Sequence, residues 1–171
     1  MDFKYSMNRT ILLLGGNLGD RIANLQKAVE LIQEKVGQVL SCSKFYETAP
    51  WGNPDQPDFI NQALVVDTPL RPVQLMLALL EIEKSIGRIR HEKWGSRLID
   101  IDIIFYNDAI IEVHSLQIPH PRMQKRRFVL VPIAEIAPSW VHPELKQDIG
   151  NLLASCEDSL EVRPMSSTAQ S

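Results

Sequence analysis

The chain has 171 residues, a hydrophobic content of 44% and a formal net charge of −3. These values allow one sizeable core, so we expect a single domain over residues 1–171 with its core at about 10–156. An acidic chain is unlike a general nucleic-acid coat, and Cys42 and Cys156 lack disulfide-framework or zinc-site spacing. Since no apolar run resembles a signal peptide or a bilayer span, we expect a cytoplasmic monomer without nucleic-acid or membrane partners.

The first third of the chain predicts a strand followed by a helix. Residues 10–14 form a short apolar run that ends in two glycines, as a buried strand entering a turn does. Asp20 is a suitable N-cap, and apolar residues then recur three and four positions apart over residues 22–36. Gly37 marks the end of this predicted helix.

The middle of the chain predicts two strands separated by a long loop. Residues 39–48 and 59–68 are rich in β-branched and aromatic residues, which favours one strand in each range. Residues 49–58 contain three prolines, a glycine and two aspartates, a composition that excludes regular structure. Long loops inside compact domains are often functional.

The second half predicts a helix, a strand and shorter elements. Pro72 suits the first turn of a helix that Gly87 ends, and residues 97–106 give the strongest strand pattern of the chain. Short helices are expected within 128–136 and 149–156, and the polar residues 157–171 are expected to form a flexible tail.

The order of the main elements is therefore β-α-β-β-α-β. This order is typical of an α+β, ferredoxin-like fold, in which two helices cover one face of an antiparallel sheet. Short C-terminal elements follow that unit.

Asp100 and Asp102 are the strongest candidates for a metal site. Side chains alternate along a strand, so Leu98, Asp100, Asp102 and Ile104 should share one face, with Ile99, Ile101, Ile103 and Phe105 on the other. Two neighbouring carboxylates repel each other unless a cation lies between them, and Mg²⁺ often takes one or two carboxylates plus phosphate oxygens. An edge strand whose aspartates form ion pairs with nearby basic residues is the alternative interpretation.

Basic residues near these aspartates favour the metal site. Residues 88–97 and 120–127 each contain four Arg or Lys residues, and the first segment ends in Arg97, three positions before Asp100. Such cations can hold the phosphates that a metal bridges. The sequence has no P-loop or dinucleotide fingerprint, so a phosphate-bearing nucleotide would be held in another way.

Four segments in order resemble the 6-hydroxymethyl-7,8-dihydropterin pyrophosphokinase family. They are LGGNLGDR at 14–21, YETAPWGNPDQPDFIN at 46–61, KWGSRLIDIDII at 93–104 and IPHPRMQKRRFVLVPIAEIAP at 118–138. The resemblance covers roughly residues 10–143. It implies pyrophosphoryl transfer from ATP to the pterin alcohol, a step of folate biosynthesis that releases AMP, with two Mg²⁺ ions at Asp100 and Asp102.

The resemblance also implies the residues that contact each substrate. ATP contacts fall at Glu83, Arg90, Lys93, Trp94, Arg97, Ile103, His120 and Arg126, and catalytic roles at Lys93, Arg97, Asp100, Asp102 and His120. The pterin pocket would use Thr48, Trp51, Phe59, Asn61 and Phe128, with Asn17 nearby. The physical argument supports the charged members, which can neutralise phosphate, and the aromatic members, which can enclose a flat ring.

Three positions depart from the pattern of some relatives. Leu80, Ser115 and Pro121 stand where some members have side chains that touch nucleotide, so we leave them out of the expected site. We also hypothesise that loops 49–58 and 88–96 close over the substrates and exclude water.

Two other functions fit parts of the sequence. A nucleotidyltransferase also pairs a glycine-rich turn with Asp-x-Asp, but its turn usually lies close before the aspartates, whereas Gly15 and Asp100 are far apart here. RNA-binding RRM domains share the β-α-β-β-α-β order, but no RNP1-like string is present.

Overall fold

A computed structural model describes residues 7–50, 55–87, 98–113 and 115–166. Its main sheet has six strands in the order β5-β1-β4-β3-β8, with β2 also paired to β4, and every pairing is antiparallel. The strands are β1 (Asn8–Gly16), β2 (Gln38–Cys42), β3 (Tyr46–Thr48), β4 (Phe59–Thr68), β5 (Asp100–Tyr106) and β8 (Val162–Pro164). A separate hairpin joins β6 (Ile111–Val113) to β7 (Leu116–Ile118).

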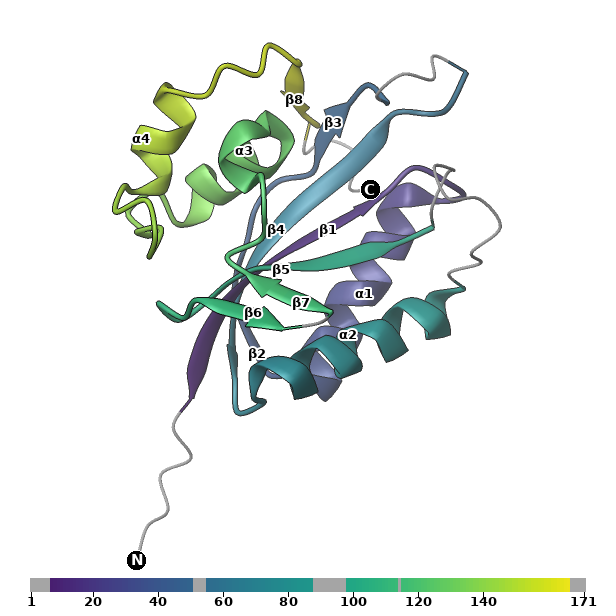
Figure 1. Cartoon of the computed structure of the whole chain (residues 1–171). Helices are drawn as coiled ribbons and strands as arrows, with labels where there is room; N and C mark the ends of the chain where they lie inside the picture. The colour runs from purple at the N-terminus through teal and green to yellow at the C-terminus, as the bar shows by residue number, and fades with distance from the viewer. Residues whose placement is uncertain (1–6, 51–54, 88–97, 114, 167–171) are drawn as a thin grey trace, which may run out of the picture.

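The two long helices lie on one face of the sheet (Figure 1). Helix α1 (Arg21–Lys35) begins where the Asp20 carboxylate accepts a hydrogen bond from the Ala23 N–H at 3.0 Å. Helix α2 (Pro72–Ile86) ends at Gly87, whose φ of 111° is the left-handed conformation that glycine adopts without steric cost. Both helices agree with the apolar spacing in the sequence, and Asp20 and Gly87 lie at the helix ends that the sequence predicted for them.

The opposite face is covered by α3 (Arg127–Ile136) and α4 (Ile149–Ala154) (Figure 1). Ile11, Leu13, Ile104 and Phe105 of the sheet belong to the apolar cluster on this side. The mixed α/β architecture with an antiparallel sheet is thus confirmed. The helices of the C-terminal region also give the sheet a second covered face, which the β-α-β-β-α-β pattern did not predict.

Two predictions about strands were wrong in detail. Residues 39–48 form not one strand but β2 and β3, because the chain leaves the ladder at Ser43, whose hydroxyl accepts from the Ala63 N–H at 2.9 Å. Phe105 was expected on the face of Ile103 but lies in the opposite cluster. The register of β5 against β1 shifts between Ile11 and Leu12, and this bulge reverses the alternation beyond Ile103.

Residues 157–166, for which the sequence indicated a flexible tail, contain strand β8. The strand pairs with β3, so that Val162 lies opposite Thr48. The Met165 N–H continues the contact by donating to the Phe45 carbonyl at 2.8 Å. Residues 167–171 lie outside the described part of the chain.

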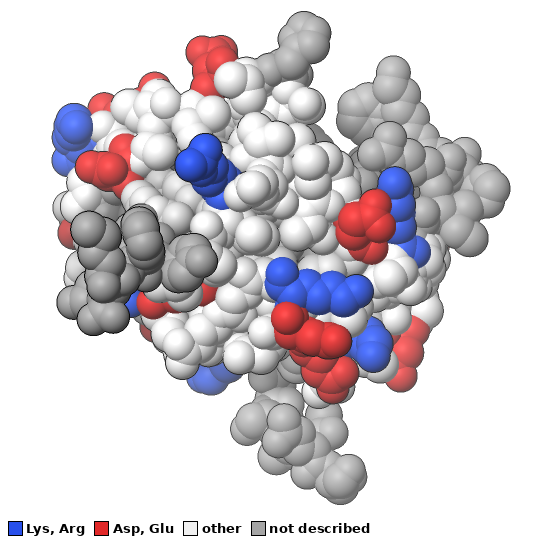
Figure 2. Space-filling view, turned by 90° about the horizontal axis from the view of Figure 1, so that it is seen from below, with Lys and Arg blue, Asp and Glu red and all other residues white. Residues whose placement is uncertain are grey.

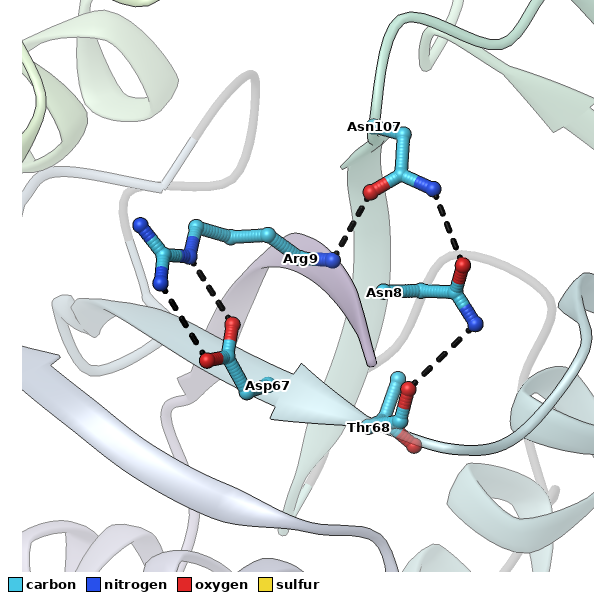
Figure 3. Close-up of polar contacts among 5 residues, drawn as sticks. All are labelled: Asn8, Arg9, Asp67, Thr68 and Asn107. Carbon is cyan, nitrogen blue, oxygen red and sulfur yellow. Dashed lines mark hydrogen bonds and ion pairs between the residues drawn. The ribbon is translucent and has the colours of Figure 1, made fainter. Parts of the chain in front are cut away.

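The sheet end that carries Asn8 and Arg9 is closed by a polar network (Figure 3). The Arg9 side chain contacts both carboxylate oxygens of Asp67 at 2.8 and 3.2 Å. Asn107 bridges two residues of β1, since its carbonyl accepts from the Arg9 N–H at 2.8 Å and its amide donates to Asn8 at 3.0 Å. These contacts join β1 to β4 and to the turn after β5.

The surface charge is mixed on the side of the molecule shown in Figure 2. On that face several basic side chains lie beside acidic ones, at least one is surrounded by other residues, and other residues make up much of the area. No helix within the described ranges is long and apolar enough to cross a bilayer.

Candidate active site

The site begins with a row of three residues across the middle of the sheet. Gly15 of β1 lies opposite Asn61 of β4 on one side and opposite Asp100 of β5 on the other. A Cβ atom at Gly15 would lie 2.5 Å from the Asn61 Oδ1 atom, closer than real Cβ contacts allow. Glycine at this position therefore leaves open space on the sheet surface between the amide and the carboxylate.

That space belongs to a cavity of about 710 Å³ on the α3 face of the sheet. Leu13, Gly15 and Asn61 form its floor, and Asp100 and Asp102 lie along one side. The remaining described residues around it are Thr48, Ala49, Phe59, Arg122, Lys125, Arg126, Phe128, Asp158 and Leu160. We call this space the first cavity. It unites Thr48, Phe59, Asn61 and Phe128, four of the six residues expected to bind the pterin.

Basic residues from the segment before α3 line the first cavity together with the two aspartates. Arg122 and Arg126 flank the short 3₁₀ turn Met123–Lys125, and Lys125 is its last residue. The Arg126 guanidinium carbon lies 5.7 Å from the centroid of the Phe128 ring, a cation–π geometry that holds the two side chains together. The cavity thus combines three carboxylates, three cations and two phenylalanines, which suits a flat aromatic ring attached to a phosphate-bearing arm.

A second cavity of about 860 Å³ lies along the outer edge of β5. Residues 100–103 of that strand form one side, and α2 and the β6–β7 hairpin form the others. Among its lining residues, Met76, Leu77, Leu80, Val113 and Leu116 supply apolar surface. A cavity with apolar walls and a carboxylate-lined side suits a nucleotide whose base is buried and whose phosphates reach Asp100 and Asp102.

Glu83 and His120 satisfy the backbone of the edge strand β5. The buried Glu83 side chain accepts from the Ile101 N–H at 2.8 Å. The His120 N–H donates to the Ile104 carbonyl at 3.0 Å. Both residues line the second cavity, as does Ile103, so three of the expected ATP contacts come together there. The Glu83 contact shows, in addition, that this side chain supports the strand that carries the aspartates.

Asp100 and Asp102 line both cavities. Their separation of two residues on β5 puts both on the side that faces the cavities, as the alternation of the strand predicted. The described residues contain no group of three or more His, Cys, Asp or Glu side chains suited to a metal. Two carboxylates are nevertheless enough for Mg²⁺ when waters and phosphate oxygens complete its octahedron. The donor set therefore fits Mg²⁺ brought together with a phosphate-bearing substrate.

Asn17 is not among the described residues that line either cavity. The side chain is buried, and its amide donates to the Pro57 carbonyl at 3.2 Å and to Gln56 at 3.4 Å. Asn17 thereby fixes the chain just before Phe59. Phe59 itself lines the first cavity.

Several expected site residues lie outside the described residues, and other lining residues were not expected. The first group consists of Trp51, Arg90, Lys93, Trp94 and Arg97. Residues 51–54 of loop 49–58 and the whole of loop 88–96 also lie outside the described residues. Leu80, Ser115 and Pro121, which the sequence analysis set aside, all line the second cavity. Arg122 and Lys125 belong to the basic segment 120–127 but were not singled out, and Asp158 and Leu160 lie where a tail was expected.

Comparison with known proteins identifies the family. Residues 11–138 match the family described as 7,8-dihydro-6-hydroxymethylpterin-pyrophosphokinase (HPPK). The chain belongs to the HPPK family. The resemblance found in the four sequence segments is confirmed, and with it the prediction of a pyrophosphokinase.

Relatives of the HPPK family match most of the chain. The 2-amino-4-hydroxy-6-hydroxymethyldihydropteridine pyrophosphokinase of a Synechocystis species is 45% identical over 153 residues, which are 89% of this chain and 78% of the relative. The Bacillus subtilis protein of the same name is 42% identical over 130 residues, or 75% of this chain and 78% of the relative.

The solved structures agree on the fold. The structure of Plasmodium falciparum HPPK-DHPS wild type with STZ-DHP is 18% identical in sequence and matches with a TM-score of 0.70. The matched region covers 87% of this chain. The matched part is 43% of that solved chain, so the present chain spans less than half its length. At this identity the likeness concerns the fold alone.

Proposed function

We propose that this HPPK-family chain transfers the pyrophosphoryl group of ATP to the hydroxymethyl group of 6-hydroxymethyl-7,8-dihydropterin. The observation that carries the proposal is that two cavities of suitable size meet at Asp100 and Asp102. A reaction between two substrates needs their reacting atoms held together, and a shared pair of carboxylates gives both a common point of attachment.

The first cavity is the proposed pterin site. Phe59 and Phe128 offer aromatic surface for the bicyclic ring, and Asn61 with Thr48 offers donors and acceptors for its polar edge. The second cavity is the proposed ATP site, with the base against the apolar surface of α2 and the hairpin. His120 and Arg126, and by resemblance Arg90, Lys93, Trp94 and Arg97, would act on the triphosphate.

Two Mg²⁺ ions are proposed at Asp100 and Asp102. When bound, such ions neutralise phosphate charge and draw the oxygens of both substrates together. The protein contributes position and charge: the aspartates hold the ions, and the basic residues stabilise charge that develops during transfer. The pterin hydroxyl oxygen forms a bond to the β-phosphorus while the bond from that phosphorus to the α,β-bridging oxygen breaks; AMP leaves with that oxygen and its electron pair, and the hydroxyl proton passes to water.

The finer features of the protein belong to the same proposal. The order β5-β1-β4 with β2 and β3 beside β4, all antiparallel, supports a ferredoxin-like topology. We further propose that the chain is one domain and acts as a cytoplasmic monomer.

The nucleotide product tests the proposal. The protein is incubated with ATP, Mg²⁺ and 6-hydroxymethyl-7,8-dihydropterin, and the nucleotides are separated by chromatography. We expect AMP in amounts equal to the pterin diphosphate. ADP as the product would indicate transfer of a single phosphoryl group, and either ADP or an unchanged ATP peak would contradict the proposal.

A further inference from the structure

The C-terminal segment 157–166 forms part of the wall of the first cavity. Asp158 and Leu160 both line it, although the HPPK family match ends at residue 138. This side of the cavity is therefore built by a part of the chain outside the match.

Asp158 connects this segment to the start of α3. One carboxylate oxygen accepts from the Arg127 N–H at 3.0 Å, and the other accepts from the Leu160 N–H at 3.0 Å. Arg127 is the first residue of α3, and the residue before it, Arg126, makes no side-chain cap to the helix. The first N–H groups of a helix need acceptors from outside it, and a carboxylate there also interacts favourably with the helix dipole.

The two residues beside Arg127 in the chain line the first cavity. Phe128 follows Arg127 directly, and Arg126 precedes it with its guanidinium over the Phe128 ring. Because Asp158 holds the Arg127 backbone, it fixes where these two side chains stand relative to Asn61 and Gly15 on the cavity floor.

Two further contacts hold the same segment to the other wall. Strand β8 pairs with β3, whose Thr48 lines the cavity. The Arg163 guanidinium lies 2.9 Å from the Asp58 carboxylate, one residue before Phe59. The segment thus spans from the wall with Phe128 to the wall with Thr48 and Phe59, and the distance between the walls depends on it.

We propose that Asp158 is a positioning residue for the pterin substrate: it caps α3 from outside the helix and thereby sets Phe128 and Arg126 against the cavity floor. Both carboxylate oxygens are engaged by backbone N–H groups, so its action on the substrate runs through α3. This inference rests on the proposed function, because it assigns the first cavity to the pterin.

The test compares three variants of the full-length protein by steady-state kinetics with each substrate varied in turn. Asp158→Ala removes the cap, and Asp158→Asn keeps one acceptor oxygen. Asp148→Ala is the matched control, because the Asp148 carboxylate caps α4 by accepting from the Asn151 N–H at 2.8 Å and is not among the described residues lining either cavity.

We expect Asp158→Ala to raise the KM for the pterin by roughly three- to tenfold, the size of effect that the loss of a typical helix cap gives. The KM for ATP and kcat should change less than the KM for the pterin, because of the two positioned side chains only Arg126 is also proposed to act on the triphosphate. Asp158→Asn should fall between the wild type and Asp158→Ala, and Asp148→Ala should change the thermal midpoint without raising the KM for the pterin. If the alanine variant does not fold, the asparagine variant decides the test.

A second measurement separates this inference from the proposed function. Binding of 6-hydroxymethylpterin, followed by its fluorescence in the absence of ATP, should weaken in Asp158→Ala and not in Asp148→Ala. A wild-type protein that forms no AMP contradicts the proposed function, while the binding measurement still reports on Asp158. An unchanged pterin KM and affinity in Asp158→Ala, or an equal loss in Asp148→Ala, would overturn the inference.

Discussion

The two ends of strand β1 use polar residues in opposite ways. At its beginning, Asn8 and Arg9 pair with Asp67, Thr68 and Asn107, and the side chains satisfy one another across three segments (Figure 3). At its end, Gly15 has no side chain, and its neighbours Asn61 and Asp100 face a cavity. The first end serves the pairing of strands, whereas the second places polar groups along a cavity.

The contrast predicts that substitutions at the cavity end change activity more than stability. Asp102→Asn removes a charge that the proposed Mg²⁺ site needs, so the rate of AMP formation should fall on the order of 10²- to 10³-fold. Because Asp102 is exposed at its strand, the thermal midpoint should hardly change. Chromatography of the nucleotides and a thermal melt of the same preparation measure both effects. An Asp102→Asn protein with full activity would remove the metal assignment.

The open floor at Gly15 gives the next largest effect. In Gly15→Ala the new methyl group would meet the Asn61 amide oxygen, so we expect a loss of about 1–3 kcal/mol in the free energy of unfolding. Pterin affinity should also fall, since the Asn61 side chain must move. Urea denaturation and pterin fluorescence measure the two quantities. Gly150→Ala is the control: its added Cβ meets its nearest neighbour at 3.5 Å, an ordinary contact, and should not lower stability.

At the other end of β1, the opposite pattern is expected. Asp67→Asn removes the ion pair with Arg9, which holds the pKa of the Asp67 carboxyl below its usual value through its hydrogen bond and charge. Such exposed pairs contribute up to about 1 kcal/mol, so the free energy of unfolding should decrease by no more than that. AMP formation should equal that of the wild type. A large loss of activity in Asp67→Asn would mean that the two ends are coupled and would break the comparison.

His142 gives the smallest effect, on the pH dependence of stability. Burial lowers the pKa of its imidazole from 6.5, and its Nδ1 atom accepts from the Glu144 and Leu145 N–H groups at 3.1 Å. Below pH 6.5 the histidine binds a proton in the unfolded chain, whereas in the folded chain it binds one only at lower pH. The contribution of neutral His142 to the free energy of unfolding is therefore complete above pH 6.5 and is lost as the pH falls through the lower folded pKa. Asn at position 142 can keep the acceptor without titrating. Denaturation at several pH values should therefore show a smaller loss between neutral and acidic pH in His142→Asn than in the wild type.

Local patterns in the sequence predicted most of the fold. The helix faces of α1 and α2 follow directly from apolar spacing, and Asp20 and Gly87 mark ends that backbone chemistry imposes on any helix. The break between β2 and β3 could not be predicted in the same way. It depends on the Ser43 hydroxyl meeting the Ala63 backbone, a contact between segments that are distant along the chain.

The bulge in β5 shows the same limit. Its seven residues read as regular alternation, and only pairing with β1 reveals that Phe105 changes faces. Once there, Phe105 stacks on Trp140 with ring centroids 5.6 Å apart, so the packing of the C-terminal region depends on the irregularity.

The residues of the candidate site also differ in whether the sequence could predict them. Asp100 and Asp102 were singled out by the alternation of a strand, whereas Asn61 and Phe128 were expected only through the resemblance to the family. Leu160 and Asp158 lie in a polar stretch with no such pattern, and their role depends on where the chain returns after α4. Arg122 and Lys125 could have been singled out from the basic segment, since they belong to the same run as Arg126.

Strand β8 also affects how the protein behaves in concentrated solution. The open rim of a sheet is a template on which another chain can add a strand and begin to aggregate. Here β8, the outermost strand beside β3, has three residues and ends in Pro164, which lacks an N–H. At the opposite rim, the Glu83 side chain and the His120 backbone form hydrogen bonds with the backbone of β5. The return of the C-terminal chain to the sheet therefore covers β3 and leaves little backbone at this rim for a second molecule to extend.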